Sequence, residues 1–294
     1  MNTFQELGLN EDLLHAITDL GFTKPSEVQE KAIPLLLEED KDLVALAQTG
    51  TGKTAAFLLP LLHRLLTSPH HAGDINALVI VPTRELVSQV VEEAEKICQN
   101  TFIRVCGVHG GNSMKKDRDA LAQSADIIVA TPGRLYDLFL ARVIKYAAIK
   151  KVVIDEVDVM LDLGFRFQLT NIFDLLPKKR QHIMFSATMT NDVDELIKDF
   201  FKSPKKISVA LSGTPLDNIK QTSYLVTNFY TKANLLNHLL ADRDTFTKVL
   251  VFVSNKRRAD LLFNVVEEHF GSESCIIHSN KTQNYRIRSI RQFD

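Results

Sequence analysis

A short apolar run, a glycine-containing loop and an amphipathic segment follow one another between residues 43 and 66, and this order constrains the fold more than any other feature of the chain. Residues 43–47 (LVALA) are typical of a buried parallel strand, and residues 53–66 carry apolar side chains at helical intervals. Between them, Gly50 and Gly52 allow backbone conformations closed to other residues, so successive N–H groups can point inward at a helix N-terminus. The segment therefore predicts a strand-loop-helix turn that binds phosphate.

We expect this loop to hold the phosphates of a nucleoside triphosphate. Its residues are Ala47, Gln48, Thr49, Gly50, Thr51, Gly52, Lys53 and Thr54. Lys53 would reach the β- and γ-phosphates, and the Thr54 hydroxyl would be a ligand of Mg²⁺. Ala47 stands where the usual pattern has its first glycine and should still pack at the strand end. The alternative is a glycine loop that merely joins strand to helix.

A second apolar strand ends in carboxylates. Val152-Val153-Ile154 would carry Asp155 and Glu156 to the carboxyl edge of a sheet, where α/β proteins bind ligands. Asp155 would then hold Mg²⁺ through water, and Glu156 would orient and deprotonate the attacking water, with Lys53 as the third catalytic residue. The reaction implied is hydrolysis of the β–γ phosphoanhydride bond. An isolated Asp-Glu pair, by contrast, would be a solvated turn.

Apolar runs and amphipathic segments alternate along most of the chain, which predicts an α/β fold. The first group of expected strands lies at residues 42–47, 77–81, 103–108, 126–130, 151–155, 182–186 and 205–209, and the expected helices include 83–98 and 191–201. After a Ser-Gly-Thr-Pro stretch that interrupts the pattern, further strands are expected at 221–226, 248–253 and 274–277, with helices at 234–240, 258–268 and 284–293.

These motifs together resemble the DEAD-box ATP-dependent RNA helicases of superfamily 2, with Val157 as the third letter of the eponymous motif. The resemblance implies a P-loop NTPase (RecA-like) doubly wound parallel sheet, followed by a partial second RecA-like domain. It implies an ATP-binding domain at residues 1–210, with an adenine-reading motif at residues 2–30, a linker at 211–218 and a partial C-terminal domain at 219–294. The implied cofactors are ATP and Mg²⁺.

The adenine-reading segment of that family is similar to residues 21–29 here, preceded by an isolated aromatic residue. The residues concerned are Phe4, Phe22, Thr23, Pro25 and Gln29. An amide such as Gln29 can accept a hydrogen bond from adenine N6 and donate one to N7, which guanine cannot match. Without the resemblance, Phe22 and Pro25 would be core residues and Gln29 a surface amide.

Three further segments, each just after a strand, resemble those that hold the sugar-phosphate backbone of single-stranded RNA in the family. They contain Pro82, Thr83 and Arg84, then Gly110 and Gly111, then Thr131, Pro132, Gly133 and Arg134. Helix N-termini, hydroxyls and arginine would make these contacts rather than base edges. Taken singly, each segment could be an ordinary strand-to-helix loop.

The segment from Ser186 to Thr188 resembles the one that couples the ATP site to RNA binding, and Asp158 is its expected hydrogen-bond partner. Val157 is the visible departure from the family, and its bulk and stiffness could shift how Asp158 meets Ser186 and Thr188. Because Val is apolar and can be accommodated, we expect altered coupling at most.

The later motifs of the family are absent from the printed chain, including the His-Arg-x-Gly-Arg-x-x-Arg string with its arginine fingers. Since such a finger is worth on the order of 10³–10⁵ in hydrolysis rate, we expect the polypeptide to bind ATP and to hydrolyse it poorly. We expect a truncated helicase, because an incomplete parallel sheet exposes an edge that folded domains normally cover, and the alternative is a natural short form. The alternative functions are an ATP-gated RNA-binding module without turnover and a DNA-directed helicase.

Composition adds little to these expectations. The formal net charge of −1 gives no global support for RNA binding, and the basic runs at 178–180 and 256–258 are explained equally well as solvated faces. Three widely spaced cysteines, an N-terminus without a signal peptide and the lack of a long apolar span favour a cytoplasmic protein with reduced thiols and no membrane contact. We expect a monomer.

Overall fold

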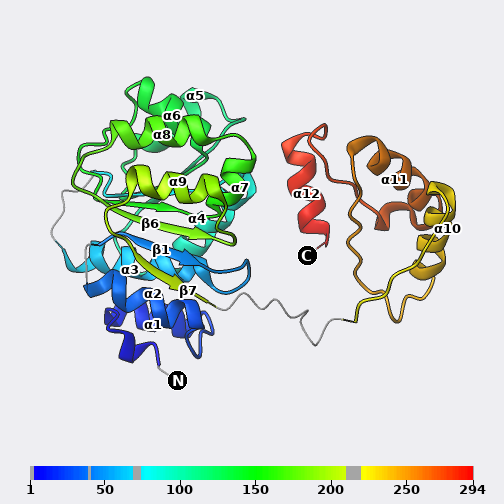
Figure 1. The fold of residues 1–294 in the computed structure, drawn as a ribbon, viewed down its shortest axis with the longest axis horizontal. Coiled ribbons are helices and arrows are strands. Elements are labelled where there is room, and N and C mark those ends of the chain that lie inside the picture. Colours follow the sequence, from blue (N-terminus) through cyan, green and yellow to red (C-terminus); the bar gives the residue numbers. More distant parts are fainter. Residues whose placement is uncertain (1–2, 39–40, 69–73, 210–219, 294) are drawn as a thin grey trace. The chain divides into compact units, whose positions relative to one another are not determined.

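The first part of the chain is built on a seven-stranded sheet with the order β3-β4-β2-β5-β6-β1-β7 (Figure 1). The computed structural model describes residues 3–38, 41–68, 74–209 and 220–293. Its strands are β1 (Leu43–Leu46), β2 (Ala77–Ile80), β3 (Val105–Val108), β4 (Ile127–Ala130), β5 (Lys151–Ile154), β6 (Gln181–Ser186) and β7 (Lys205–Ser208). All the strand pairs are parallel, with Leu43 opposite Ile183 and Ala77 opposite Lys151, for example. The seven predicted strands are thus confirmed.

Helices cover both faces of this sheet. One face carries η1 (Gln5–Leu7), α1 (Glu11–Asp19), α2 (Glu27–Glu38), α3 (Lys53–Thr67) and α4 (Arg84–Cys98). The other carries α5 (Met114–Leu121), α6 (Pro132–Leu140), α7 (Val157–Asp162), α8 (Arg166–Leu175) and α9 (Asn191–Phe200). Within β5, Val153 packs into the first apolar cluster while Val152 and Ile154 pack into the second, as the two-residue period of a strand requires. The predicted doubly wound α/β sheet is confirmed.

The chain divides into two compact units, residues 1–213 and 214–294. The second unit contains α10 (Phe229–Leu240), α11 (Lys256–Phe270), η2 (Gly271–Glu273) and α12 (Gln283–Phe293), so its three predicted helices are confirmed. The linker expected at 211–218 lies outside the described residues.

The strands predicted at 221–226, 248–253 and 274–277 are wrong, because no strand occurs among residues 220–293. A strand needs a neighbouring strand to satisfy its backbone, and these segments have none in this part of the structure. In the segment 248–253, apolar side chains are accordingly open to solvent: Leu250 is 65% exposed and Phe252 is 88% exposed. Apolar composition alone therefore indicated strands where the pairing partners are missing.

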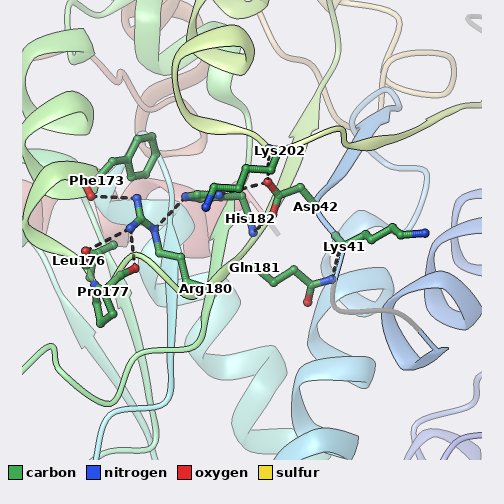
Figure 2. Close-up of polar contacts among 9 residues, drawn as sticks. All are labelled: Lys41, Asp42, Phe173, Leu176, Pro177, Arg180, Gln181, His182 and Lys202. Atoms are coloured by element: carbon green, nitrogen blue, oxygen red, sulfur yellow. Dashed lines mark hydrogen bonds and ion pairs between the residues drawn. The ribbon is translucent and has the colours of Figure 1, made fainter.

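A buried polar network closes the amino-terminal edge of the sheet, beside the starts of β1 and β6 (Figure 2). The Asp42 carboxylate accepts hydrogen bonds from the backbone N–H groups of His182 and Lys202, both at 2.7 Å. Arg180 Nε donates to His182 Nε2 at 2.9 Å. The other nitrogens of Arg180 donate to the carbonyl oxygens of Phe173, Leu176 and Pro177 at the end of α8. Arg180 is therefore not the solvated cation that its position in a basic run suggested.

Among the described residues no helix has the length and apolar character needed to cross a membrane. All three cysteines are free thiols, with Cys98 buried and Cys106 and Cys275 half-buried.

Candidate functional site

The strand order sorts the predicted site residues into two adjacent groups. The segments expected to bind nucleotide phosphates and Mg²⁺ follow β1 and β5, and the segment expected to couple the two ligands follows β6. The segments expected to bind RNA follow β2, β3 and β4. In the sheet each group is contiguous, as β3-β4-β2 beside β5-β6-β1. Because all strands are parallel, both groups lie at the same carboxyl edge, where α/β sheets bind ligands. The two groups meet where β2 adjoins β5.

The loop after β1 has the backbone of a phosphate cradle. Gly50 and Gly52 have φ of 81° and 91°, in the left-handed region, and Gly52 is the N-cap of α3. The Thr51 hydroxyl donates to the Gln48 carbonyl at 2.8 Å and closes the loop on itself. Ala47 is fully buried and donates its N–H to the Ser186 carbonyl at 2.9 Å. The loop thus directs backbone N–H groups at the N-terminus of a fifteen-residue helix.

Lys53 and Asp155 form a buried ion pair with a 3.5 Å separation between Nζ and Oδ1, their side chains 5% and 9% exposed. Within the described structure the Lys53 ammonium has no hydrogen-bond partner. Burial raises the pKa of Asp155, and Glu156 adds to this rise while Lys53 opposes it. A buried ammonium that lacks acceptors at the end of a phosphate-type loop is suited to phosphate oxygens.

The residues present also fit Mg²⁺. The Thr54 hydroxyl and the Asp155 carboxylate are hard oxygen donors, and the described residues contain no group of three or more His, Cys, Asp or Glu side chains able to hold a metal. Mg²⁺ commonly takes one or two protein oxygens and fills its other positions with water and phosphate. Thr54 and Asp155 would therefore hold the ion only together with a nucleotide, whose phosphates Lys53 would bind.

Glu156 has φ of 55° and is the N-cap of α7, a left-handed conformation that costs a non-glycine residue about 1–3 kcal/mol. Its N–H donates to Asp155 Oδ1 at 2.9 Å. The Thr49 hydroxyl lies 3.5 Å from Glu156 Oε1, so the carboxylate faces the phosphate loop. Strained residues of this kind concentrate at functional sites, which agrees with the predicted role of Glu156.

The predicted adenine-reading segment is joined to the phosphate loop through Gln29. The Gln29 side chain is buried, accepts from Ser26 N–H at 2.9 Å and donates to the Gly52 carbonyl at 3.0 Å. Each end of the amide can make one further hydrogen bond. Phe4 is buried and meets Phe22 edge-on, with ring centroids 6.1 Å apart. Pro25 is buried, whereas Thr23 is exposed.

Of the predicted RNA-binding residues, Arg84 and the glycine pair are in direct contact. The Arg84 guanidinium lies against Gly110 and Gly111, and Thr83 caps α4 by accepting from Leu86 N–H at 3.3 Å. Pro82, Thr131 and Pro132 are buried beside them. Gly133 has open space around it, so its backbone can be approached. Arg134 differs from Arg84 because it is ion-paired with Asp117 at 3.1 Å.

The hydrogen bond predicted between Asp158 and residues 186–188 forms at Thr188. Asp158 Oδ2 accepts from Thr188 N–H at 2.9 Å and from Thr188 Oγ1 at 2.8 Å. Ser186 was expected to meet Asp158 as well, but its hydroxyl donates to the Thr188 carbonyl at 2.7 Å. Val157 is fully buried in the second apolar cluster, so its bulk is accommodated in the core.

Three residues near these sites had no signal in the sequence. Burial raises the pKa of the half-buried Glu93 of α4, and the Thr54 hydroxyl opposes this rise. Asp117 and Asn112 surround Arg134. None of the three belongs to a motif, and only the packing of the folded chain gives them polar partners. Their contacts could not be read from the motifs.

Comparison with protein families matches residues 26–196 to the DEAD/DEAH box helicase family. The chain is 39% identical over 292 residues to the DEAD-box ATP-dependent RNA helicase RhpA of Helicobacter pylori, covering 99% of this chain and 58% of that protein. It is 36% identical to the RNA helicase CrhR of Synechocystis, with the same coverage of both. The chain thus spans 58% of the length of these relatives.

Two solved structures are also similar. A DEAD box protein from the hyperthermophile Methanococcus jannaschii shares 33% identity with a TM-score of 0.68, covering 99% of this chain and 77% of that one. S. cerevisiae Dbp5 bound to RNA and ADP BeF3 shares 32% identity with a TM-score of 0.87, covering 100% of this chain and 73% of that one. The α/β fold class with a partial second domain is confirmed.

Proposed function

The chain belongs to the DEAD/DEAH box helicase family, and from this premise we propose that it binds ATP with Mg²⁺ and single-stranded RNA side by side on one sheet edge. ATP hydrolysis would be coupled to local separation of an RNA duplex. The observation that carries the ATP part is the buried Lys53 ammonium, which faces Asp155 at 3.5 Å and lacks a hydrogen-bond partner in the described structure.

On this proposal different residues of the chain bind the phosphates, select adenine and activate the attacking water. The loop N–H groups and Lys53 hold the phosphates, and Gln29 selects adenine. Glu156 orients a water molecule in line with the β–γ bond and takes its proton. When bound, Mg²⁺ neutralises the negative charge that develops on the phosphate oxygens. Thr54 and Asp155 are the groups that would hold it.

RNA would lie across the ends of β2, β3 and β4. Arg84, the backbone of Gly133 and the N-termini of α4 and α6 are suited to phosphates, because helix N-termini attract anions. No base edge needs to be read, so the proposed grip is independent of RNA sequence. Thr188 follows β6 and is bound to Asp158, which follows β5, the strand next to β2. This pair would couple the binding of one ligand to that of the other.

We assign the ATP-binding domain to residues 1–210, the linker to 211–218 and the partial C-terminal domain to 219–294. The 294-residue polypeptide contains no His-Arg-x-Gly-Arg-x-x-Arg string, so its hydrolysis should be slow even with RNA present. A cytoplasmic, monomeric protein remains part of the proposal.

Calorimetry with MgATP tests the nucleotide site directly. We expect the wild-type chain to bind and Lys53→Ala to lose most of that binding, while Lys31→Ala, which removes an exposed lysine, should match the wild type. Absence of heat from the wild-type chain at millimolar MgATP would refute the proposal.

Labelled single-stranded RNA with a non-hydrolysable ATP analogue tests the second ligand, with unlabelled poly-ribose and poly-deoxyribose strands as competitors. If the poly-ribose strand displaces the labelled RNA better than the poly-deoxyribose strand, the chain prefers RNA through 2′-hydroxyl contacts. If both strands displace it equally, the result supports a DNA-directed helicase. Glu156→Gln should keep MgATP binding and abolish the remaining hydrolysis. Hydrolysis by this variant at the wild-type rate would remove Glu156 from the role of base.

A further inference from the structure

Arg134 and Asp117 form an ion pair inside the first unit. Arg134 Nη1 lies 3.1 Å from Asp117 Oδ2, and the two side chains are 10% and 3% exposed. Asp117 is the single buried residue of α5, a helix whose other side chains are exposed or half-buried. Two charges taken out of water depend on each other, because removing one leaves the other unpaired in a poorly solvating environment.

Both members of the ion pair interact with Asn112. Arg134 Nη2 donates to the Asn112 carbonyl at 2.6 Å, and the Asn112 side chain opposes the rise that burial causes in the pKa of Asp117. Asn112 also forms an isolated backbone bridge with Gly110. His109 Nδ1 lies 3.0 Å from the Gly110 carbonyl. The turn from Gly110 to Ser113 is therefore fixed by side chains that come from α5 and α6.

The turn at residues 110–113 positions the side chain of Arg84. The Arg84 guanidinium lies against Gly110 and Gly111, and Gly111 has φ of 98°, which the side chain of another residue would disfavour. A contact path thus runs from Arg134 and Asp117, through Asn112, to the glycine pair and Arg84. The guanidinium of Arg134 is directed at the protein, whereas that of Arg84 lies over the glycine backbone.

We propose that Arg134 and Asp117 are positioning residues that hold the turn at 110–113 in the conformation that grips RNA, and that the Arg134 guanidinium does not itself contact a phosphate. This inference rests on the proposed RNA binding, and it changes the role that the sequence predicted for Arg134. It gives a role to Asp117, which no motif marked.

The salt dependence of RNA binding separates the two roles of Arg134. A side chain that neutralises a phosphate contributes about 0.7 to the slope of log affinity against log salt for a single strand. We therefore expect Arg134→Gln and Asp117→Asn each to weaken binding of a short labelled oligouridylate, with MgATP analogue present, by roughly tenfold at unchanged slope. The double variant should be no weaker than either single variant, since both act through one contact.

Matched controls lie on α5 itself. Arg118→Gln and Asp119→Asn make the same charge changes at exposed neighbouring positions and should leave affinity unchanged. Asn112→Ala keeps the ion pair and loses the Asn112 side chain, so it should weaken binding at unchanged slope and guards against variants that fail to fold. A slope lowered by about 0.7 in Arg134→Gln, with Asp117→Asn unaffected, would overturn the inference in favour of a phosphate contact.

Hydrogen exchange of the backbone across residues 108–114 tests the same inference without RNA. Exchange should be faster in Arg134→Gln and Asp117→Asn than in the wild type and in the two control variants. Equal exchange in all of them would overturn the positioning role even if RNA binding were real. The two proposals can also fail separately. If the wild-type chain does not bind RNA but exchange is faster in the two variants, the proposed RNA binding is refuted, while the role of Arg134 and Asp117 in holding the turn stands.

Discussion

The guanidinium of Arg84 lies so close to Gly111 that a Cβ atom at residue 111 would stand 3.0 Å from Arg84 Cζ and closer still to its Nη1. Gly111 also has φ of 98°. The neighbouring Gly110 is less restricted. A Cβ at residue 110 would lie 3.5 Å from Arg84, an ordinary contact distance, and the φ of Gly110 is not in the left-handed region. Of the two glycines, Gly111 is the one whose lack of a side chain places Arg84.

Gly111→Ala should therefore displace Arg84 and weaken binding of labelled single-stranded RNA by roughly tenfold, because the free variant can relieve about 1–3 kcal/mol of backbone strain by leaving the conformation that binds RNA. Gly110→Ala is the matched control and should stay within about threefold of the wild type, since its contact distance is ordinary and its φ is not in the left-handed region. MgATP affinity, measured by calorimetry, should not change in either variant. Equal RNA affinities for Gly110→Ala and Gly111→Ala would contradict this reading of the contact.

Local patterns were sufficient for the strands of the first unit and for the phosphate loop. Runs such as Val152-Val153-Ile154 are apolar on both faces, which only a covered parallel sheet accommodates, and Gly50 and Gly52 mark the left-handed turns. The order of the strands could not be derived in this way, because it depends on crossovers between distant segments. That order decides that the RNA segments lie together and beside the nucleotide segments.

Contacts between distant side chains were equally beyond local patterns. Arg134 belongs to a motif that predicts an RNA contact, yet Asp117, seventeen residues earlier, pairs with it in the folded chain. Arg180 belongs to a basic run, yet it donates to carbonyl groups at the end of α8. In the second unit, the apolar segment 248–253 matches a buried strand in composition, but strand formation also needs a partner to pair with.

Thr188→Val should reduce the coupling between ATP and RNA. The substitution keeps the N–H bond to Asp158 Oδ2 at 2.9 Å and removes the hydroxyl bond at 2.8 Å, a loss of about 1–3 kcal/mol for a buried carboxylate. We expect MgATP and RNA to bind separately with wild-type affinity, while the gain in RNA affinity caused by an ATP analogue becomes smaller. Thr18→Val makes the same chemical change on exposed α1 and should keep the full gain. An undiminished gain in Thr188→Val would separate Thr188 from coupling.

Asp42→Asn should destabilise the sheet in a pH-dependent way. Burial raises the pKa of Asp42, but the hydrogen bonds from His182 and Lys202 outweigh it and hold the pKa below its ordinary 3.8. Asp42 then binds fewer protons when folded, so its contribution is complete well above pH 3.8 and is lost as the pH falls through the lower folded value. At pH 7 the variant should lose about 1.5–3 kcal/mol of unfolding free energy in urea, followed by circular dichroism.

The exposed Asp194, which pairs with Lys198 at 2.6 Å one helical turn away, provides the control for this measurement. Asp194→Asn should hardly change the urea midpoint at pH 7, because water already solvates that pair. The difference in unfolding free energy between the wild type and Asp42→Asn should become smaller as the pH falls below 3.8, where the carboxyl of the unfolded chain is mostly protonated. If this difference does not change with pH, the charge of Asp42 does not contribute to stability.

Protonation of His63 should lower the stability of the first unit in mild acid. Its Nδ1 accepts a hydrogen bond from Asn10 N–H at 3.0 Å, which ties the start of α1 to α3, and burial together with Arg64 lowers the pKa of His63 below its ordinary 6.5. The unfolded chain therefore binds a proton more readily, so this contribution is complete above pH 6.5 and declines as the pH falls below it. In thermal melts between pH 8 and pH 5.5, His63→Gln should lose less stability than the wild type, since a glutamine oxygen can accept the same bond and does not titrate. His15→Gln, at an exposed position of α1, should follow the wild type at every pH. If His63→Gln and the wild type lose stability in parallel, another group must be the one that takes up the proton.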